Sequence, residues 1–247
     1  MKIVTVNGIT KSGKTTTVEA IIKELKRRKF SVGSIKDIHF ESFTMDEKGT
    51  NTYRHHQAGA DMVVAKGIYE TDVLIYKALD IERIFDFFDH DWLICEGVEN
   101  ANIPKIVTGK NSEDIELKLD DTTIAISGVY GNDFQEYKQL KVYHYENDIA
   151  ELVDFLERIV PHRLPNMDPK CCTACNMTCH EMLLHVLKNP QDNQCVLQNQ
   201  DVKVTINGVS LTMVPFVQKL VKNAVVGVLS ELDGYKENAT IDIEFKT

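Results

Sequence analysis

The sequence predicts an α/β fold, in which a mostly parallel sheet has flanking helices, followed by a small α+β second domain that contains cysteines. Three observations support this prediction. Short apolar segments alternate with amphipathic helical segments through residues 1–160. A glycine-rich loop joins the first strand to the first helix. A proline-rich linker over 161–169 then separates this domain from a cysteine-rich domain over 170–247.

The first strand, residues 2–6, leads directly into GITKSGKT, which matches the phosphate-binding pattern GxxxxGK[ST]. Glycines in this loop let backbone N–H groups approach an anion, and an amphipathic helix over 16–29 directs its positive end to the same place. Lys14 supplies a charge to the phosphates, and the Thr15 hydroxyl is a ligand for Mg²⁺. The pattern predicts a P-loop NTPase. The expected nucleotide-binding residues are Gly8, Thr10, Lys11, Ser12, Gly13, Lys14, Thr15 and Thr16.

A second strand is expected over 31–36, and residues 37–61 then turn polar, with no obvious regular structure. Loops of this length are usually functional or disordered. Two interpretations remain open. One is a substrate or switch loop that uses Lys36, His39 and Arg54, and the other is a solvated surface loop.

Residues 91–97 form an apolar strand that ends in Glu96 and resembles a Walker B strand, whose acid lies beside Mg²⁺ and the attacking water. Lys14 and Glu96 are therefore the expected catalytic residues, and Cys95 is expected to be a small core residue. The other strands and helices of this domain are expected at 61–65, 72–76, 81–88, 103–107, 122–126, 141–143 and 148–160.

The composition limits the classes of partner and the cellular location that are expected. The formal net charge of −9 argues against a general nucleic-acid binder, because affinity for the phosphate backbone depends on Lys and Arg. No apolar stretch is long enough to span a membrane, and the N-terminal apolar run is too short for a signal peptide, so a cytoplasmic protein is expected.

With these motifs established, residues 1–160 resemble the molybdopterin-guanine dinucleotide biosynthesis protein B family, MobB. The family's P-loop form GxxxSGKTT is present, and Asp46 matches an acid of the family's polar loop. Asp37, Phe40 and Asn51 depart from that loop's usual residues. The other matching segments are 36–40 (KDIHF), 49–52 (GTNT), 58–60 (AGA), 95–97 (CEG) and 104–106 (PKI).

This resemblance implies a GTP-binding protein with weak Mg²⁺-dependent GTPase activity that assists the guanylyltransferase which joins GMP to molybdopterin. The implied partners are that enzyme, molybdopterin or its guanine dinucleotide, and a second copy of the chain in a homodimer. The implied Mg²⁺ ligands are Thr15, Glu96 and Asp46. GTP rather than ATP rests on the resemblance, because the chain has no Asn/Thr-Lys-x-Asp segment. A metallochaperone GTPase for metalloenzyme maturation is an alternative.

In the second domain, Cys172, Cys175, Cys179 and Cys195 have the spacing C-x2-C-x3-C-x15-C, and Cys171 is an alternative ligand. Four thiolates suit a [4Fe–4S] cluster or a tetrahedral Zn²⁺. The stretch resembles the small four-cysteine iron–sulfur domain of electron-transfer and corrinoid proteins, with one residue fewer between the second and third cysteines. A redox- or metal-responsive binding module is therefore a further interpretation of the function. A helix over 182–187 and a ββαβ unit over 202–206, 209–213, 215–232 and 240–245 are expected, with a tight turn at 207–208.

Overall fold

The computed structural model describes residues 1–40, 42–166, 175–192, 195, 202, 204–206, 209–211, 213–236 and 240–243. Within it the chain divides into two compact units, Met1–Arg163 and Leu164–Thr247.

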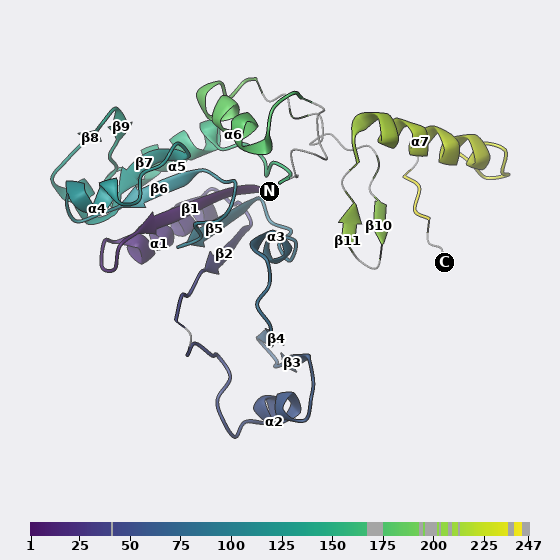
Figure 1. Ribbon diagram of the computed structural model, residues 1–247, viewed down its shortest axis with the longest axis horizontal. Coiled ribbons are helices and arrows are strands. Elements are labelled where there is room, and N and C mark those ends of the chain that lie inside the picture. Colours follow the sequence, from purple (N-terminus) through teal and green to yellow (C-terminus); the bar gives the residue numbers. More distant parts are fainter. Residues whose placement is uncertain are drawn as a thin grey trace. The chain divides into compact units, whose positions relative to one another are not determined.

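The first unit is built on a five-stranded sheet in the order β2-β5-β1-β6-β7 (Figure 1). Its strands are β1 (Lys2–Gly8), β2 (Val32–Lys36), β5 (Trp92–Glu96), β6 (Lys105–Thr108) and β7 (Thr123–Ser127). All neighbouring strands are parallel, which confirms the predicted sheet. Every residue of β5 and β6 is buried, as is usual for strands covered on both faces.

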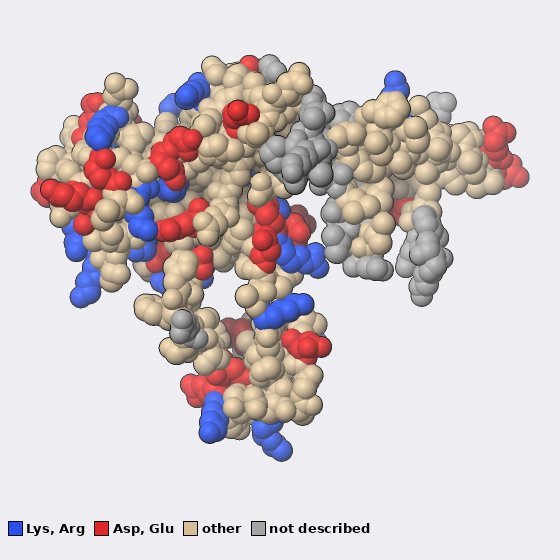
Figure 2. Space-filling view, in the orientation of Figure 1, with Lys and Arg blue, Asp and Glu red and all other residues tan. Residues whose placement is uncertain are grey.

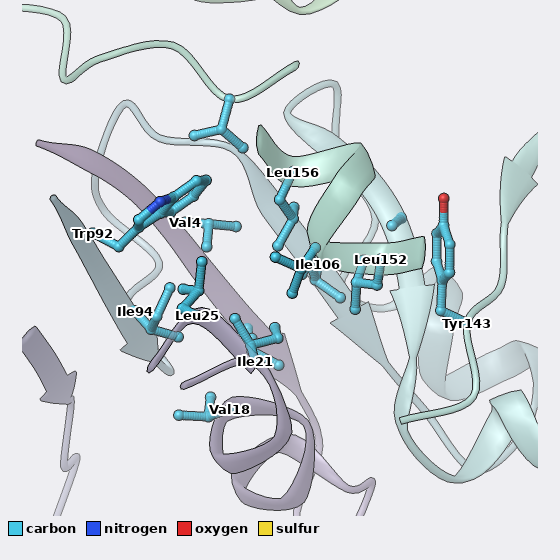
Figure 3. Packing of buried hydrophobic residues seen from close by; sticks show 14 of the residues in the cluster. Val4, Val18, Ile21, Leu25, Trp92, Ile94, Ile106, Tyr143, Leu152 and Leu156 are labelled. Carbon is cyan, nitrogen blue, oxygen red and sulfur yellow. The ribbon is translucent and has the colours of Figure 1, made fainter. Parts of the chain in front are cut away.

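Two helices, α1 (Lys14–Arg27) and α5 (Ile149–Ile159), cover one face of the sheet. Their apolar sides meet the strands in the largest core cluster, part of which Figure 3 shows. Arg28, at the end of α1, donates hydrogen bonds to Asp154 and Glu157 of α5 at 2.5 and 2.7 Å. Packing and ion pairs therefore hold the helix that follows the P-loop.

The opposite face of the sheet is covered by the short helices α3 (Ile81–Phe85) and α4 (Ser112–Glu116). Phe85 of α3 packs with side chains of β1 and β5, and Ile115 of α4 packs with those of β6 and β7. The first unit therefore has helices on both faces of a parallel sheet, which confirms the predicted fold class.

The polar segment after β2 differs from the expected loop. It contains α2 (Asn51–Gln57), and the Thr50 hydroxyl accepts a hydrogen bond from the Tyr53 N–H at the start of that helix. β3 (Met62–Lys66) and β4 (Thr71–Ile75) then pair antiparallel in a separate two-stranded sheet. Figure 1 shows these elements on two extended connections, apart from the five-stranded sheet. The predicted strands exist, but they do not extend the parallel sheet.

The chain after β7 stays close to the sheet edge. It forms the 3₁₀ helix η1 (Gly128–Asn132) and the small hairpin of β8 (Glu136–Tyr137) and β9 (Leu140–Lys141). Val142 then makes a parallel bridge with Ile126 of β7. The strand expected at 141–143 is thus split between this hairpin and the bridge.

The second unit contains α6 (Cys179–Lys188), β10 (Val204–Ile206), β11 (Val209–Leu211) and α7 (Pro215–Leu229). α6 begins earlier than expected because Thr178 and Glu181 form a capping box. β10 and β11 pair antiparallel, whereas the turn expected at 207–208 lies outside the described residues. Residues 240–243 have no regular secondary structure where a last strand is expected, and residues 244 and 245 are not described.

In the described residues, no helix is long and apolar enough to cross a membrane. On the face that Figure 2 shows, Lys and Arg side chains of the first unit are interspersed with Asp and Glu, without one continuous basic patch.

Candidate functional site

The P-loop lies at the carboxyl end of β1, against the first turn of α1. Gly13 has a φ of 97° and Lys11 a φ of 61°, so the loop turns through left-handed backbone conformations. Gly8 is packed so closely that an added Cβ would meet the Thr108 carbonyl oxygen at 2.2 Å. This loop has the tight backbone that allows N–H groups to surround a phosphate.

The Lys14 ammonium is held inside this loop. Its Nζ donates hydrogen bonds to the carbonyl oxygens of Gly8 at 2.9 Å and Ile9 at 2.6 Å. Burial lowers the pKa of Lys14 from its usual value, while the carboxylate of Glu96 opposes that change. Lys14 therefore presents a partly desolvated cation at the positive end of α1, where a phosphate is attracted most strongly.

Glu96 is the centre of a short polar cluster beside the P-loop. It ends β5, its side chain is 9% exposed, and its Oε1 accepts a hydrogen bond from the Thr15 hydroxyl at 2.8 Å. The Lys36 ammonium, at the end of β2, lies 3.0 Å from the same oxygen. The structure thus brings together four predicted residues, Lys14, Thr15, Lys36 and Glu96. A hydroxyl and a carboxylate in contact are a suitable ligand pair for Mg²⁺, directly or through water.

Sequence reasoning missed the residues that support the loop from the neighbouring strands. Ser12 is fully buried, and its hydroxyl lies 2.6 Å from that of Thr108 at the end of β6. The Val129 N–H donates to the Ser12 carbonyl at 2.9 Å, and Gly128 packs directly under the loop. Their position in the sequence was the available signal, because Thr108 ends one apolar strand of a parallel sheet and Gly128 directly follows another.

The remaining predicted residues of the polar segment have other neighbours. The Asp46 carboxylate accepts hydrogen bonds from Thr50 and Thr52, each at 2.8 Å, and from Tyr76 at 2.8 Å. Burial raises the pKa of Asp46, but these hydrogen bonds outweigh that effect and lower the pKa from its usual value. In the described part of the chain, no hydrogen bond or ion pair joins Asp46 to the P-loop. Asp46 instead connects the start of α2 to Tyr76, the residue that directly follows β4.

Two other predicted residues of that segment lie on its surface. His39 Nε2 is 3.8 Å from an Asp37 oxygen, and Arg54 is exposed on α2. Thr10, Lys11 and Thr16 are exposed along the P-loop and the first turn of α1.

Three of the predicted metal-binding cysteines are described. Cys175 and Cys195 pack against the apolar cluster formed by Leu164 and α6, and Cys179 is the first residue of α6. Cys171 and Cys172 lie outside the described residues. Within the described ranges, no group of three or more His, Cys, Asp or Glu side chains is placed to hold a metal ion.

Comparison with known proteins agrees with this architecture. The family model described as molybdopterin guanine dinucleotide synthesis protein B matches residues 3–128. A Methanocaldococcus jannaschii relative, named as a molybdopterin-guanine dinucleotide biosynthesis adapter protein, is 30% identical over 99% of this chain and 97% of its own. A similarly named Bacillus subtilis protein is 31% identical over 62% of this chain and 90% of its own.

The crystal structure of Bacillus subtilis MobB resembles the described fold with a TM-score of 0.55 and 26% identity, and it covers 66% of this chain and 100% of that one. The Methanocaldococcus relative therefore matches both units, whereas the Bacillus proteins match a part of the chain close in length to the first unit.

Proposed function

The chain belongs to the molybdopterin guanine dinucleotide synthesis protein B family, and from this premise we propose that it is a Mg·GTP-binding adapter in molybdopterin guanine dinucleotide biosynthesis. The observation that carries the proposal is the cluster of Lys14, Thr15, Lys36 and Glu96 at the carboxyl edge of the sheet. Family membership supports the role in molybdopterin guanine dinucleotide biosynthesis, and the cluster supports the binding of Mg·GTP.

The residues of the cluster have distinct roles in this proposal. Backbone N–H groups of the P-loop and the Lys14 ammonium bind the phosphates, and Thr15 with Glu96 holds Mg²⁺. Mg²⁺, when bound, neutralises charge on the β- and γ-phosphates. Glu96 also orients a water for slow hydrolysis, and the ion pair with Lys36 holds this buried carboxylate in place.

As an adapter, the protein assists the guanylyltransferase that joins GMP to molybdopterin, by contacting that enzyme, molybdopterin or the dinucleotide product. The names of the relatives support this role. We also propose a homodimer. The apolar side chains of β3 and β4 support it, because Met62, Val64 and Val73 are each more than half exposed. A monomeric mass in solution with nucleotide bound would contradict the dimer.

For the second unit we propose a [4Fe–4S] cluster on Cys172, Cys175, Cys179 and Cys195, with Cys171 as an alternative ligand and Zn²⁺ as an alternative metal. The spacing of the cysteines supports the cluster, as does the packing of Cys175 and Cys195 against one apolar group. Protein purified without oxygen should contain iron and sulfide in nearly equal amounts. Zinc instead of iron and sulfide would indicate a structural zinc site. The absence of iron, sulfide and zinc would exclude a metal site on these cysteines.

Isothermal titration calorimetry with Mg·GTP tests the nucleotide site. Lys14→Ala should weaken binding at least about 100-fold, because a charge-assisted contact to phosphate is lost from a partly buried site. Lys26→Ala, an exposed lysine near the end of the same helix, is the matched control and should bind as the unaltered protein does. Equal affinities for all three proteins would exclude the P-loop as the nucleotide site.

A further inference from the structure

We infer that the nucleoside of the bound nucleotide lies in a groove between α1 and residues 144–149, and that Glu146 selects guanine there. This inference rests on the proposed nucleotide binding and names the base-recognition site within it. The site is of interest because the chain has no Asn/Thr-Lys-x-Asp segment to read guanine.

The strand order gives the direction in which the nucleotide lies. Glu96 ends β5, on one side of β1, and with Thr15 it would hold Mg²⁺ and so place the terminal phosphates on that side. β6 and β7 lie on the other side of β1. A nucleotide with its phosphates at the start of α1 therefore directs its ribose and base toward the segments that follow β7.

A groove of about 420 Å³ lies on that side of α1, within the size range of small-ligand sites. It begins at Thr16, two residues after Lys14, and continues along the helix past Lys23. Seven residues of helix rise about 10 Å, which is enough for a ribose and a base. The residues that line it are Thr16, Glu19, Ala20, Lys23, Glu24, Arg27, Tyr145, Glu146 and Ile149.

The wall opposite α1 is fixed by hydrogen bonds. The Ser127 hydroxyl donates to the Tyr143 carbonyl at 2.8 Å, which ties the segment to the end of β7. His144 Nδ1 then accepts hydrogen bonds from the N–H groups of Glu146 and Asn147 at 3.1 and 3.2 Å. The backbone that carries Tyr145 and Glu146 is therefore ordered beside the groove, which lowers the entropy cost of binding.

Among the carboxylates of the groove, Glu146 is the one that remains available. Glu19 lies 3.6 Å from Lys23, and Glu24 is paired with Arg27 and Arg28. Glu146 is exposed, and within the described residues its carboxylate makes no ion pair or hydrogen bond.

The chemistry of the base explains why a carboxylate is selective. Guanine presents two adjacent donors, N1–H and the 2-amino group, and one carboxylate accepts both. Adenine presents a lone pair at N1, which a carboxylate repels. Tyr145 also lines the groove, and one face of its ring stacks on His144 with 4.9 Å between ring centroids, so we assign the other face to either base. We therefore assign selectivity to Glu146 and general affinity for the nucleoside to Tyr145.

Calorimetry with the Mg²⁺ complexes of GTP, inosine triphosphate, xanthosine triphosphate and ATP tests this assignment. The unaltered chain should bind GTP at least about tenfold more tightly than ATP, with the inosine nucleotide between them because it lacks the 2-amino donor. Glu146→Gln should weaken GTP about tenfold, change ATP less than about twofold, and move preference toward the xanthosine nucleotide, whose 2-oxo group accepts from an amide. Tyr145→Ala should weaken all four by similar factors.

Glu70→Gln, in the exposed turn between β3 and β4, is the matched control and should keep the original preference. Equal GTP and ATP affinities in the unaltered chain, or an unchanged preference in Glu146→Gln, would overturn the assignment while phosphate binding stands. If Lys14→Ala loses affinity for all four nucleotides, the unaltered chain binds their phosphates at the P-loop. P-loop binding and guanine selection by Glu146 can therefore fail separately.

Discussion

The contribution of Glu24, a residue of α1, to the unfolding free energy can be measured through its dependence on pH. Its side chain is only 8% exposed, and it accepts hydrogen bonds from Arg27 at 2.7 Å and from Arg28 at 2.8 Å. Hydrogen bonds from Arg27 lower the pKa of Glu24 from 4.5 to about 2. Burial of the carboxylate opposes this change, and Arg28 adds to it. That difference corresponds to at most about 3 kcal/mol of unfolding free energy at neutral pH. Because the Arg27 side chain is 69% exposed, we expect about 2 kcal/mol.

The sign follows from the direction of the pKa change. The folded-state pKa of Glu24 lies below the unfolded-state value, so its stabilisation is complete above pH 4.5 and declines as the pH falls toward 2. Glu24→Gln should therefore lower the unfolding free energy by about 2 kcal/mol at pH 7 and by less than half of that at about pH 3.

Urea denaturation followed by tryptophan fluorescence measures this effect, because Trp92, the only tryptophan, is buried in the same core as Leu25 of α1. Glu19→Gln, at an exposed position of α1, is the control and should change the unfolding free energy by less than about 0.5 kcal/mol at either pH. An equal loss at pH 7 and pH 3 in Glu24→Gln would refute the reasoning.

Three further predictions concern side-chain packing within the first unit. Gly8→Ala should destabilise the first unit by about 1–3 kcal/mol in the same urea assay and weaken Mg·GTP binding, because its Cβ would overlap Thr108. Cys95, whose pKa burial raises to about 12, should resist iodoacetamide at pH 8 in the native protein and react after unfolding, as peptide mass spectrometry would show. Tyr76→Phe removes a 2.8 Å hydrogen bond to Asp46 and should speed amide exchange in β4 roughly tenfold. An unchanged unfolding free energy in Gly8→Ala, alkylation of native Cys95, or an unchanged exchange rate in Tyr76→Phe would each contradict the packing described for that residue.

The P-loop and the Glu96 strand were predictable because their signals are local. A glycine-rich turn between an apolar strand and an amphipathic helix leaves few alternatives, and an acid at the end of a fully apolar strand is visible without a partner. By contrast, the contact between Lys36 and Glu96 depends on β2 pairing with β5, two strands 60 residues apart. No local pattern encodes that neighbour relation.

The segment after β2 was misread for a different reason. α2 has seven residues and none of them is buried, so it produces no apolar periodicity, and its visible signal is the Thr50 cap. The β3–β4 hairpin was found as two apolar runs, but its separation from the main sheet depends on tertiary packing. The groove beside Tyr145 was also invisible in the sequence, because its two walls come from α1 and from a segment more than 100 residues later.

The adapter function is tested most directly by the rate at which a purified molybdopterin guanylyltransferase forms the guanine dinucleotide from molybdopterin and Mg·GTP, with and without this protein. We predict that the unaltered chain increases the rate and that Lys14→Ala does not, while Lys26→Ala acts as the unaltered chain does. The same rate with and without the chain, or full stimulation by Lys14→Ala, would contradict the claim that nucleotide bound at this P-loop supports the adapter function.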